Sequence, residues 1–198
     1  MQLISNFGDA AVLLPAPLGL IAFLVRFGSR ADAAAFAAAL AVCLMTALLA
    51  KLAFAACGEG HSAFGLESPS GHTAFGATFY GCLALLFAAG RPLGLRLALY
   101  GGAAALIALI GVSRVALEAH TAQEVGVGLL IGAASIALFR ALRNEPERLD
   151  LSSRTIVQLS PFAALYALCL LVLADRWTAE PLIDAIATQI GANLHLCR

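Results

Sequence analysis

Long runs of apolar residues, separated by short polar connections, divide this chain into predicted helices. A helix needs about 20 mainly apolar residues to cross a bilayer. The predicted spanning helices cover residues 10–27, 33–57, 72–89, 93–112, 121–142 and 156–174. Three glycines give the fifth of these helices a small-residue face suited to close helix contact, Gly126, Gly128 and Gly132. We therefore expect an all-α, polytopic transmembrane helix bundle with about six spanning helices.

Composition supports a membrane protein and leaves little room for anything else. Of the 198 residues, 61% are hydrophobic and only 12% are charged, and the mean hydropathy is +0.90. Six spans and their connections use nearly the whole length, so we expect a single membrane-embedded domain over residues 1–198. Residues 178–198 are more polar and are interpreted as an amphipathic or loosely ordered tail. The net charge is zero and no basic run is present, so no nucleic-acid partner is expected.

The five cysteines do not suggest a cofactor. They show no Cys-x-x-Cys spacing, and three of them lie within apolar runs, as packing residues do. We expect no metal or redox cofactor. Cys57 and Cys197 fall on the same predicted side of the membrane, and a disulfide between them is a further prediction.

Basic residues indicate how the bundle is oriented, because arginine and lysine accumulate in short cytoplasmic loops. Eight arginines fall at helix ends that share one side: Arg26, Arg30, Arg91, Arg96, Arg140, Arg143, Arg148 and Arg154. The opposite side has four basic residues and all four histidines: Lys51, Arg114, Arg176, Arg198, His61, His72, His120 and His195. This side is predicted to face outward, with both termini. High alanine content and the preference for arginine over lysine favour a bacterial inner membrane, with the histidine side in the periplasm.

The sequence Ser-Pro-Ser-Gly-His at residues 68–72 places polar groups where an apolar helix begins. Ser70 can cap that helix, and Gly71 lets the backbone approach a ligand, so that free N–H groups face an anion. His72 lies in the first turn, where it can give or take a proton. The simpler interpretation of this stretch is a helix cap with a surface histidine.

Three further groups reach the same side. Lys51, the only lysine, lies near the end of the second predicted helix, Ser113 and Arg114 follow the fourth, and His120 precedes the fifth. A lysine inside a predicted span either belongs to a functional site or extends its ammonium group to the membrane–water interface. His120 and Glu124 are four residues apart, so the carboxylate can fix the imidazole tautomer.

Together these residues suggest phosphate chemistry. Lys51 and Arg114 can hold phosphoryl oxygens, and Ser70, the backbone of Gly71 and the helix N-terminus supply neutral donors. Two histidines allow one to attack phosphorus while the other protonates the leaving oxygen. A metal site built from His72, His120 and Glu124 is the alternative, although the spacing matches no familiar zinc signature.

These motifs resemble those of the type 2 phosphatidic acid phosphatase superfamily, membrane lipid phosphatases related to vanadium haloperoxidases. The family motif Pro-Ser-Gly-His is matched by residues 69–72, and its Ser-Arg-x5-His motif by residues 113–120. Glu124 stands where the family has aspartate. The resemblance implies that His120 is the nucleophile, that His72 is the general acid, and that Glu124 orients His120. It also implies that no metal is required.

The remaining family motif is matched only in part. Lys51 is in place, but Gly58 and Glu59 occupy the positions of the family's Arg-Pro. One phosphate ligand is therefore replaced, and a carboxylate lies where it would repel a dianion. His61 is a candidate substitute donor.

The resemblance implies a phosphatase that acts on a lipid phosphate or a polyprenyl diphosphate through a phosphohistidine. Its substrate is expected to be phosphatidate, phosphatidylglycerophosphate, undecaprenyl diphosphate or a lipid A type, with the tail kept among membrane lipids. The alternatives are a lipid-to-lipid phosphotransferase, a non-enzymatic anion transporter or binding protein, and a catalytically silent member. The sequence leaves the exact lipid and the oligomeric state open.

Overall fold

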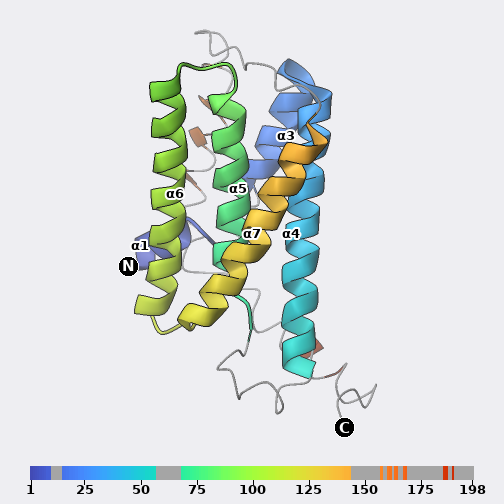
Figure 1. The fold of residues 1–198 in the computed structure, drawn as a ribbon. Helices are drawn as coiled ribbons and strands as arrows, with labels where there is room; N and C mark the ends of the chain where they lie inside the picture. Colours follow the sequence, from blue (N-terminus) through green and yellow to red (C-terminus); the bar gives the residue numbers. More distant parts are fainter. Residues whose placement is uncertain are drawn as a thin grey trace.

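The computed structural model describes residues 1–9, 15–56 and 68–143, with isolated helical positions between 157 and 189. Within these residues every regular element is a helix, and the long helices lie side by side in one bundle (Figure 1). The elements are α1 (Gln2–Asn6), α3 (Pro15–Phe27), α4 (Arg30–Ala56), α5 (Gly71–Ala88), α6 (Leu93–Ala116) and α7 (Ala122–Leu142).

Four of these helices, α4, α5, α6 and α7, are long and apolar enough to cross a membrane. The prediction of an all-α transmembrane bundle is therefore confirmed. Helix α3 has 13 residues, fewer than the roughly 20 that a spanning helix needs. Of the predicted sixth span and the tail at 178–198, only isolated helical positions are described, and the predicted pair of Cys57 and Cys197 lies outside the described residues.

Helix α6 extends beyond its predicted end. The sequence pattern places its end at residue 112, whereas the structure continues it to Ala116. The chain then forms a Schellman motif, in which the N–H of Ala119 donates to the carbonyl of Arg114 and the N–H of Glu118 to that of Val115. Glu118 takes the left-handed conformation (φ 55°) that glycine usually supplies at this position. Arg114 therefore lies within the last turns of the helix instead of after it.

Helix α5 is the centre of the bundle and contacts α4, α6 and α7. Small residues permit the closest contact, between α5 and α7. A Cβ added to Gly132 would lie 2.5 Å from Ala77 Cβ, and one added to Gly128 would lie 2.6 Å from the carbonyl oxygen of Ser70. The predicted small-residue face is thus present at two of its three glycines, while Gly126 faces open space.

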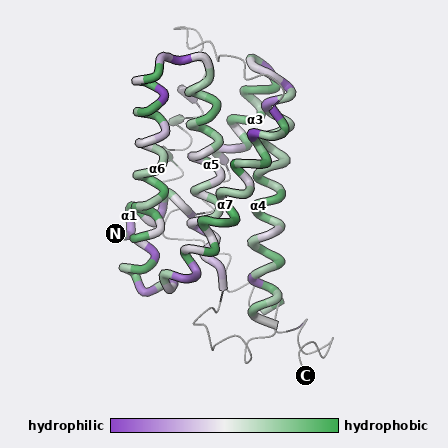
Figure 2. The backbone as a smooth tube through the Cα atoms, in the orientation of Figure 1, coloured by the Kyte–Doolittle hydropathy of each residue, from purple (hydrophilic) through white to green (hydrophobic). Residues whose placement is uncertain are grey.

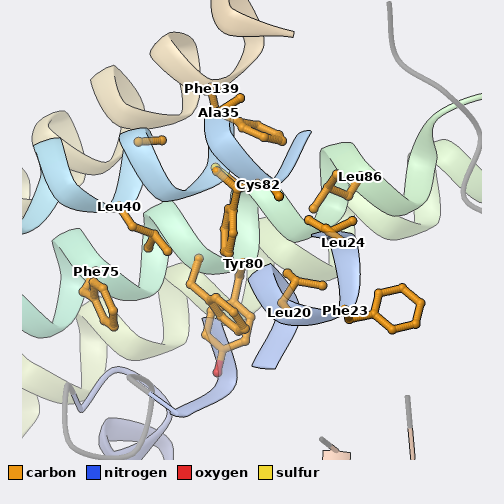
Figure 3. Packing of buried hydrophobic residues seen from close by; sticks show 14 of the residues in the cluster. Leu20, Phe23, Leu24, Ala35, Leu40, Phe75, Tyr80, Cys82, Leu86 and Phe139 are labelled. Carbon is orange, nitrogen blue, oxygen red and sulfur yellow. The ribbon is translucent and has the colours of Figure 1, made fainter. Parts of the chain in front are cut away.

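Aromatic side chains fill the space between the helices (Figure 3). The ring of Phe36 on α4 lies 6.3 Å from that of Phe79 on α5 and 6.2 Å from that of Phe139 on α7, measured between centroids. These spacings are typical of favourable aromatic pairs. The rings therefore connect three helices in the part of the bundle that holds the first turns of α4 and the last turns of α7.

The polar residues gather at the two ends of the bundle, and apolar residues dominate the length between them (Figure 2). At one end, Arg143 after α7 forms a forked ion pair with Asp32 of α4, with N–O distances of 2.7 and 3.0 Å. At the other end lie the last turns of α4 and α6 and the first turns of α5 and α7 (Figure 1). This second end holds every described candidate site residue.

Candidate active site

The first turn of α5 carries the Ser-Gly-His sequence. Ser70 is its N-cap, and its Oγ accepts a hydrogen bond from the backbone N–H of Thr73 at 3.4 Å and pairs with Thr73 Oγ1 at 3.0 Å. The predicted capping role of Ser70 is therefore confirmed. Because N–H groups in a first helical turn have no acceptor within the helix, Gly71 and His72 present a donor-rich end to the site.

His120 follows the Schellman motif that ends α6. Its backbone N–H lies 3.3 Å from the carbonyl oxygen of Arg114, so the turn fixes the histidine close to the arginine. Its ring Nδ1 lies 3.0 Å from Glu124 Oε2, and both side chains are 6% exposed. An ionised carboxylate only accepts hydrogen bonds, so Nδ1 carries a proton in this contact, and in the neutral imidazole Nε2 then carries the lone pair.

Glu124 also accepts hydrogen bonds from backbone N–H groups around the site. Its Oε2 also accepts from the N–H of Thr121, which completes a capping box at the start of α7. Its Oε1 accepts from the N–H of Ser68 at 2.8 Å, and its backbone carbonyl accepts from the N–H of Ser70 at 3.1 Å. The carboxylate therefore joins His120 to the chain that leads into α5. The longer arm of glutamate, compared with the family's aspartate, suits this combination of capping and bridging.

Arg114 is a buried cation beside this pair, with 8% of its surface exposed. Its Nη1 donates to Ser5 Oγ at 2.8 Å. Ser5 belongs to α1, which packs against the end of α6 (Figure 1). Ser113, the other predicted candidate in this turn, is fully buried and donates from Oγ to the carbonyl of Ile110 at 2.7 Å, within its own helix.

Lys51 comes from the last turns of α4 and meets the start of α5. A Cβ added to Gly71 would lie 3.6 Å from Lys51 Cε, so the end of the lysine side chain passes over this glycine. Lys51 is half-buried. The structure thus brings the lysine to the helix N-terminus that the sequence assigned to phosphate binding.

His72 has a partner that the sequence analysis missed. Its Nε2 lies 3.2 Å from Asp9 Oδ2, and the two side chains are 16% and 9% exposed. Asp9 and Ser5 both lie before the first apolar run, in a segment to which no site role was assigned. A lone carboxylate next to a predicted span, on the side that holds the histidines, was the available signal.

The described site residues form a continuous series of contacts. Lys51 meets Gly71, His72 meets Asp9, Ser5 meets Arg114, and Arg114 meets His120, which meets Glu124. His61, Gly58 and Glu59 lie outside the described residues. Across the part of the chain that is described, no group of three or more His, Cys, Asp and Glu residues is arranged to hold a metal ion.

Comparison with known proteins identifies the family. A family model described as the PAP2 superfamily matches residues 20–148, which is most of the described bundle. The chain belongs to the PAP2 superfamily. The PAP2 match includes both complete motifs and Lys51.

A relative is found in Klebsiella pneumoniae, where it is named an uncharacterized 22.5 kDa protein in the cps region. It is 34% identical to this chain over 194 residues, which cover 96% of this chain and 91% of the relative. No solved structure matches the chain significantly. Members of the PAP2 superfamily are generally phosphatases that act on lipid phosphates, and this chain is a membrane protein of that type.

Proposed function

We propose that this protein is a membrane phosphatase that cleaves a lipid phosphate monoester or a polyprenyl diphosphate through a phosphohistidine at His120. The observation that carries the proposal is the contact between His120 Nδ1 and Glu124 at 3.0 Å, beside the buried Arg114, at one end of a membrane bundle. A site at the end of the bundle suits a substrate whose tail stays in lipid while its headgroup reaches polar residues.

In this mechanism His120 Nε2 attacks phosphorus, and the bond between phosphorus and the leaving oxygen breaks. His72 gives its proton to that oxygen, so the lipid leaves as an alcohol, or as a monophosphate from a diphosphate. Water then attacks the phosphohistidine, His72 takes a proton from this water, and inorganic phosphate is released. Glu124 holds the tautomer of His120 that leaves Nε2 nucleophilic.

Phosphoryl oxygens would be held by Arg114, Lys51 and the first-turn N–H groups of α5. A forked guanidinium and a helix N-terminus both favour a phosphate dianion over neutral ligands. Ser70 contributes because it caps and so positions the start of this helix.

We further propose that the site faces the periplasm of a bacterial inner membrane. Six of the arginines predicted to be cytoplasmic belong to the described residues. All six lie at or next to helix ends on the side of the bundle opposite the site.

The test is phosphate release by purified protein in detergent. The substrates are phosphatidate, phosphatidylglycerophosphate, undecaprenyl diphosphate and a lipid A preparation, with His120→Ala as the control. We expect release from at least one substrate and none from the variant. Release that persists in folded His120→Ala would refute the proposed nucleophile. If the phosphoryl group of a labelled substrate moves only to an added lipid alcohol, the protein is a phosphotransferase. Tight binding of the substrate without turnover indicates an anion-binding protein.

A further inference from the structure

The segment before the first spanning helix reaches two residues of the proposed site. Ser5 accepts a hydrogen bond from Arg114, and Asp9 contacts His72. Backbone hydrogen bonds hold this segment in successive turns, with Gly8 N–H donating to Ser5 at 2.8 Å and Asp9 N–H to Asn6 at 3.2 Å. The position of the Asp9 carboxylate is therefore fixed by the local fold.

Packing against the bundle holds the segment in place. The hydroxyl of Tyr80 on α5 donates to the carbonyl of Phe7 at 3.0 Å, and Figure 3 shows this hydroxyl pointing away from the core toward the N-terminal chain. A Cβ added to Gly8 would lie 2.9 Å from the carbonyl oxygen of His72 and 2.8 Å from Ile110 Cγ2. Only glycine lets the backbone come this close to His72.

We infer that Asp9 is a positioning residue for His72, and that the segment Gln2–Asp9 is a wall of the active site. The inference rests on the proposed function for its catalytic meaning. Each of the two site histidines then has its own carboxylate, Glu124 for His120 and Asp9 for His72. Because the Asp9 carboxylate accepts from Nε2–H, the ring is oriented so that the Nδ1 proton of the doubly protonated His72 passes to the leaving oxygen.

This arrangement predicts which substrates depend on Asp9. An alkoxide is a poor leaving group and needs a proton, whereas para-nitrophenolate leaves without one. In Asp9→Asn we expect kcat/KM to fall about 10- to 100-fold for a short-chain phosphatidate and by no more than about threefold for para-nitrophenyl phosphate. Asp9→Glu should recover part of the lost activity toward phosphatidate.

Two further variants separate positioning from general structural damage. Gly8→Ala keeps the carboxylate but displaces the segment, and should produce the same substrate-selective loss. The double variant Asp9→Asn/His72→Gln should be no slower toward phosphatidate than His72→Gln alone, because Asp9 acts through His72. Asp32→Asn, a buried carboxylate at the opposite end, is the matched control and should leave the ratio of the two substrates unchanged.

Equal losses on both substrates, additive losses in the double variant, or faster turnover in Asp9→Asn would overturn the inference. Faster turnover would show that the segment blocks the site. Hydrolysis of para-nitrophenyl phosphate by the wild-type protein tests whether the protein is a phosphatase. The comparison of variants tests the role of Asp9, so the two proposals can fail separately.

A measurement that needs no turnover completes the test. The chain has four histidines, so nitrogen NMR signals of labelled histidine can be assigned with single variants. Asp9→Asn should shift the ring signals of His72 and leave those of His120 in place. Unchanged His72 signals would refute the contact, whether or not the enzyme is active.

Discussion

Each end of the bundle buries an arginine and a carboxylate, but the two ends arrange them differently. Arg143 is paired directly with Asp32, donates also to the carbonyl of Leu85 at 3.3 Å, and lies 5.2 Å from the Phe139 ring. At the other end, Arg114 donates to the neutral hydroxyl of Ser5, while the carboxylate of Glu124 contacts His120 and two backbone N–H groups.

The two arrangements suit different roles. A guanidinium in a forked pair with a carboxylate has its charge matched within the protein, so the Arg143 end suits the joining of helices α4, α5 and α7. The forked donors of an arginine such as Arg114 can bind two phosphoryl oxygens of an incoming anion. Carboxylates that contact histidines set the tautomers that proton transfer and nucleophilic attack require. Similar residue types thus suit structure at one end and, under the proposed function, chemistry at the other.

The largest loss of activity is expected from Glu124→Gln. Its carboxylate accepts from His120 and from the N–H groups of Thr121 and Ser68, and the amide nitrogen of glutamine would face at least one of these donors. We expect turnover per folded molecule to fall about 10²- to 10⁴-fold. The check is steady-state phosphate release, with folding confirmed by thermal unfolding in detergent. If Glu124→Gln turns over near the wild-type rate, Glu124 has no role in the mechanism.

Asp32→Asn is the same chemical change at the other end. It leaves Arg143 buried without its anionic partner, which costs about 3–5 kcal/mol of unfolding free energy when such a pair is fully buried. We expect a clearly lower unfolding temperature and an unchanged rate per folded molecule. A variant that unfolds normally but loses turnover would show that the two ends are not functionally separate.

A smaller effect is expected from the small-residue contact that sets the distance between α5 and α7. Gly132→Ala places a Cβ 2.5 Å from Ala77 Cβ, so the helices must separate, and overpacking of this kind costs about 1–3 kcal/mol. Gly101→Ala on α6, where nothing lies within 4 Å of the new Cβ, is the control. Thermal unfolding should show a loss in the first variant and little change or a gain in the second. Equal stability would mean that the contact is not tightly packed.

Much of this architecture could be predicted from the sequence, because membrane spans and paired motifs are local signals. The spans at α4 to α7, the cap at Ser70 and the i, i+4 relation of His120 and Glu124 all follow from spacing. The Schellman motif was missed because its αL residue is Glu118 instead of glycine. The roles of Ser5 and Asp9 were missed because their contacts lie 109 and 63 residues away along the chain, and no local pattern encodes such contacts.

Trapping the intermediate tests directly whether His120 carries the phosphoryl group. Protein is mixed with the phosphorus-labelled form of its best substrate, quenched, and digested with trypsin at alkaline pH, where phosphohistidine persists. Cleavage after Arg114 and Arg140 gives a peptide, residues 115–140, in which His120 is the only histidine. His72 falls in residues 52–96, because trypsin does not cleave between Arg91 and Pro92. We predict an acid-labile label on peptide 115–140 that is absent from His120→Ala. Label on peptide 52–96, or continued phosphate release by His120→Ala, would show that His120 is not the phosphorylated residue.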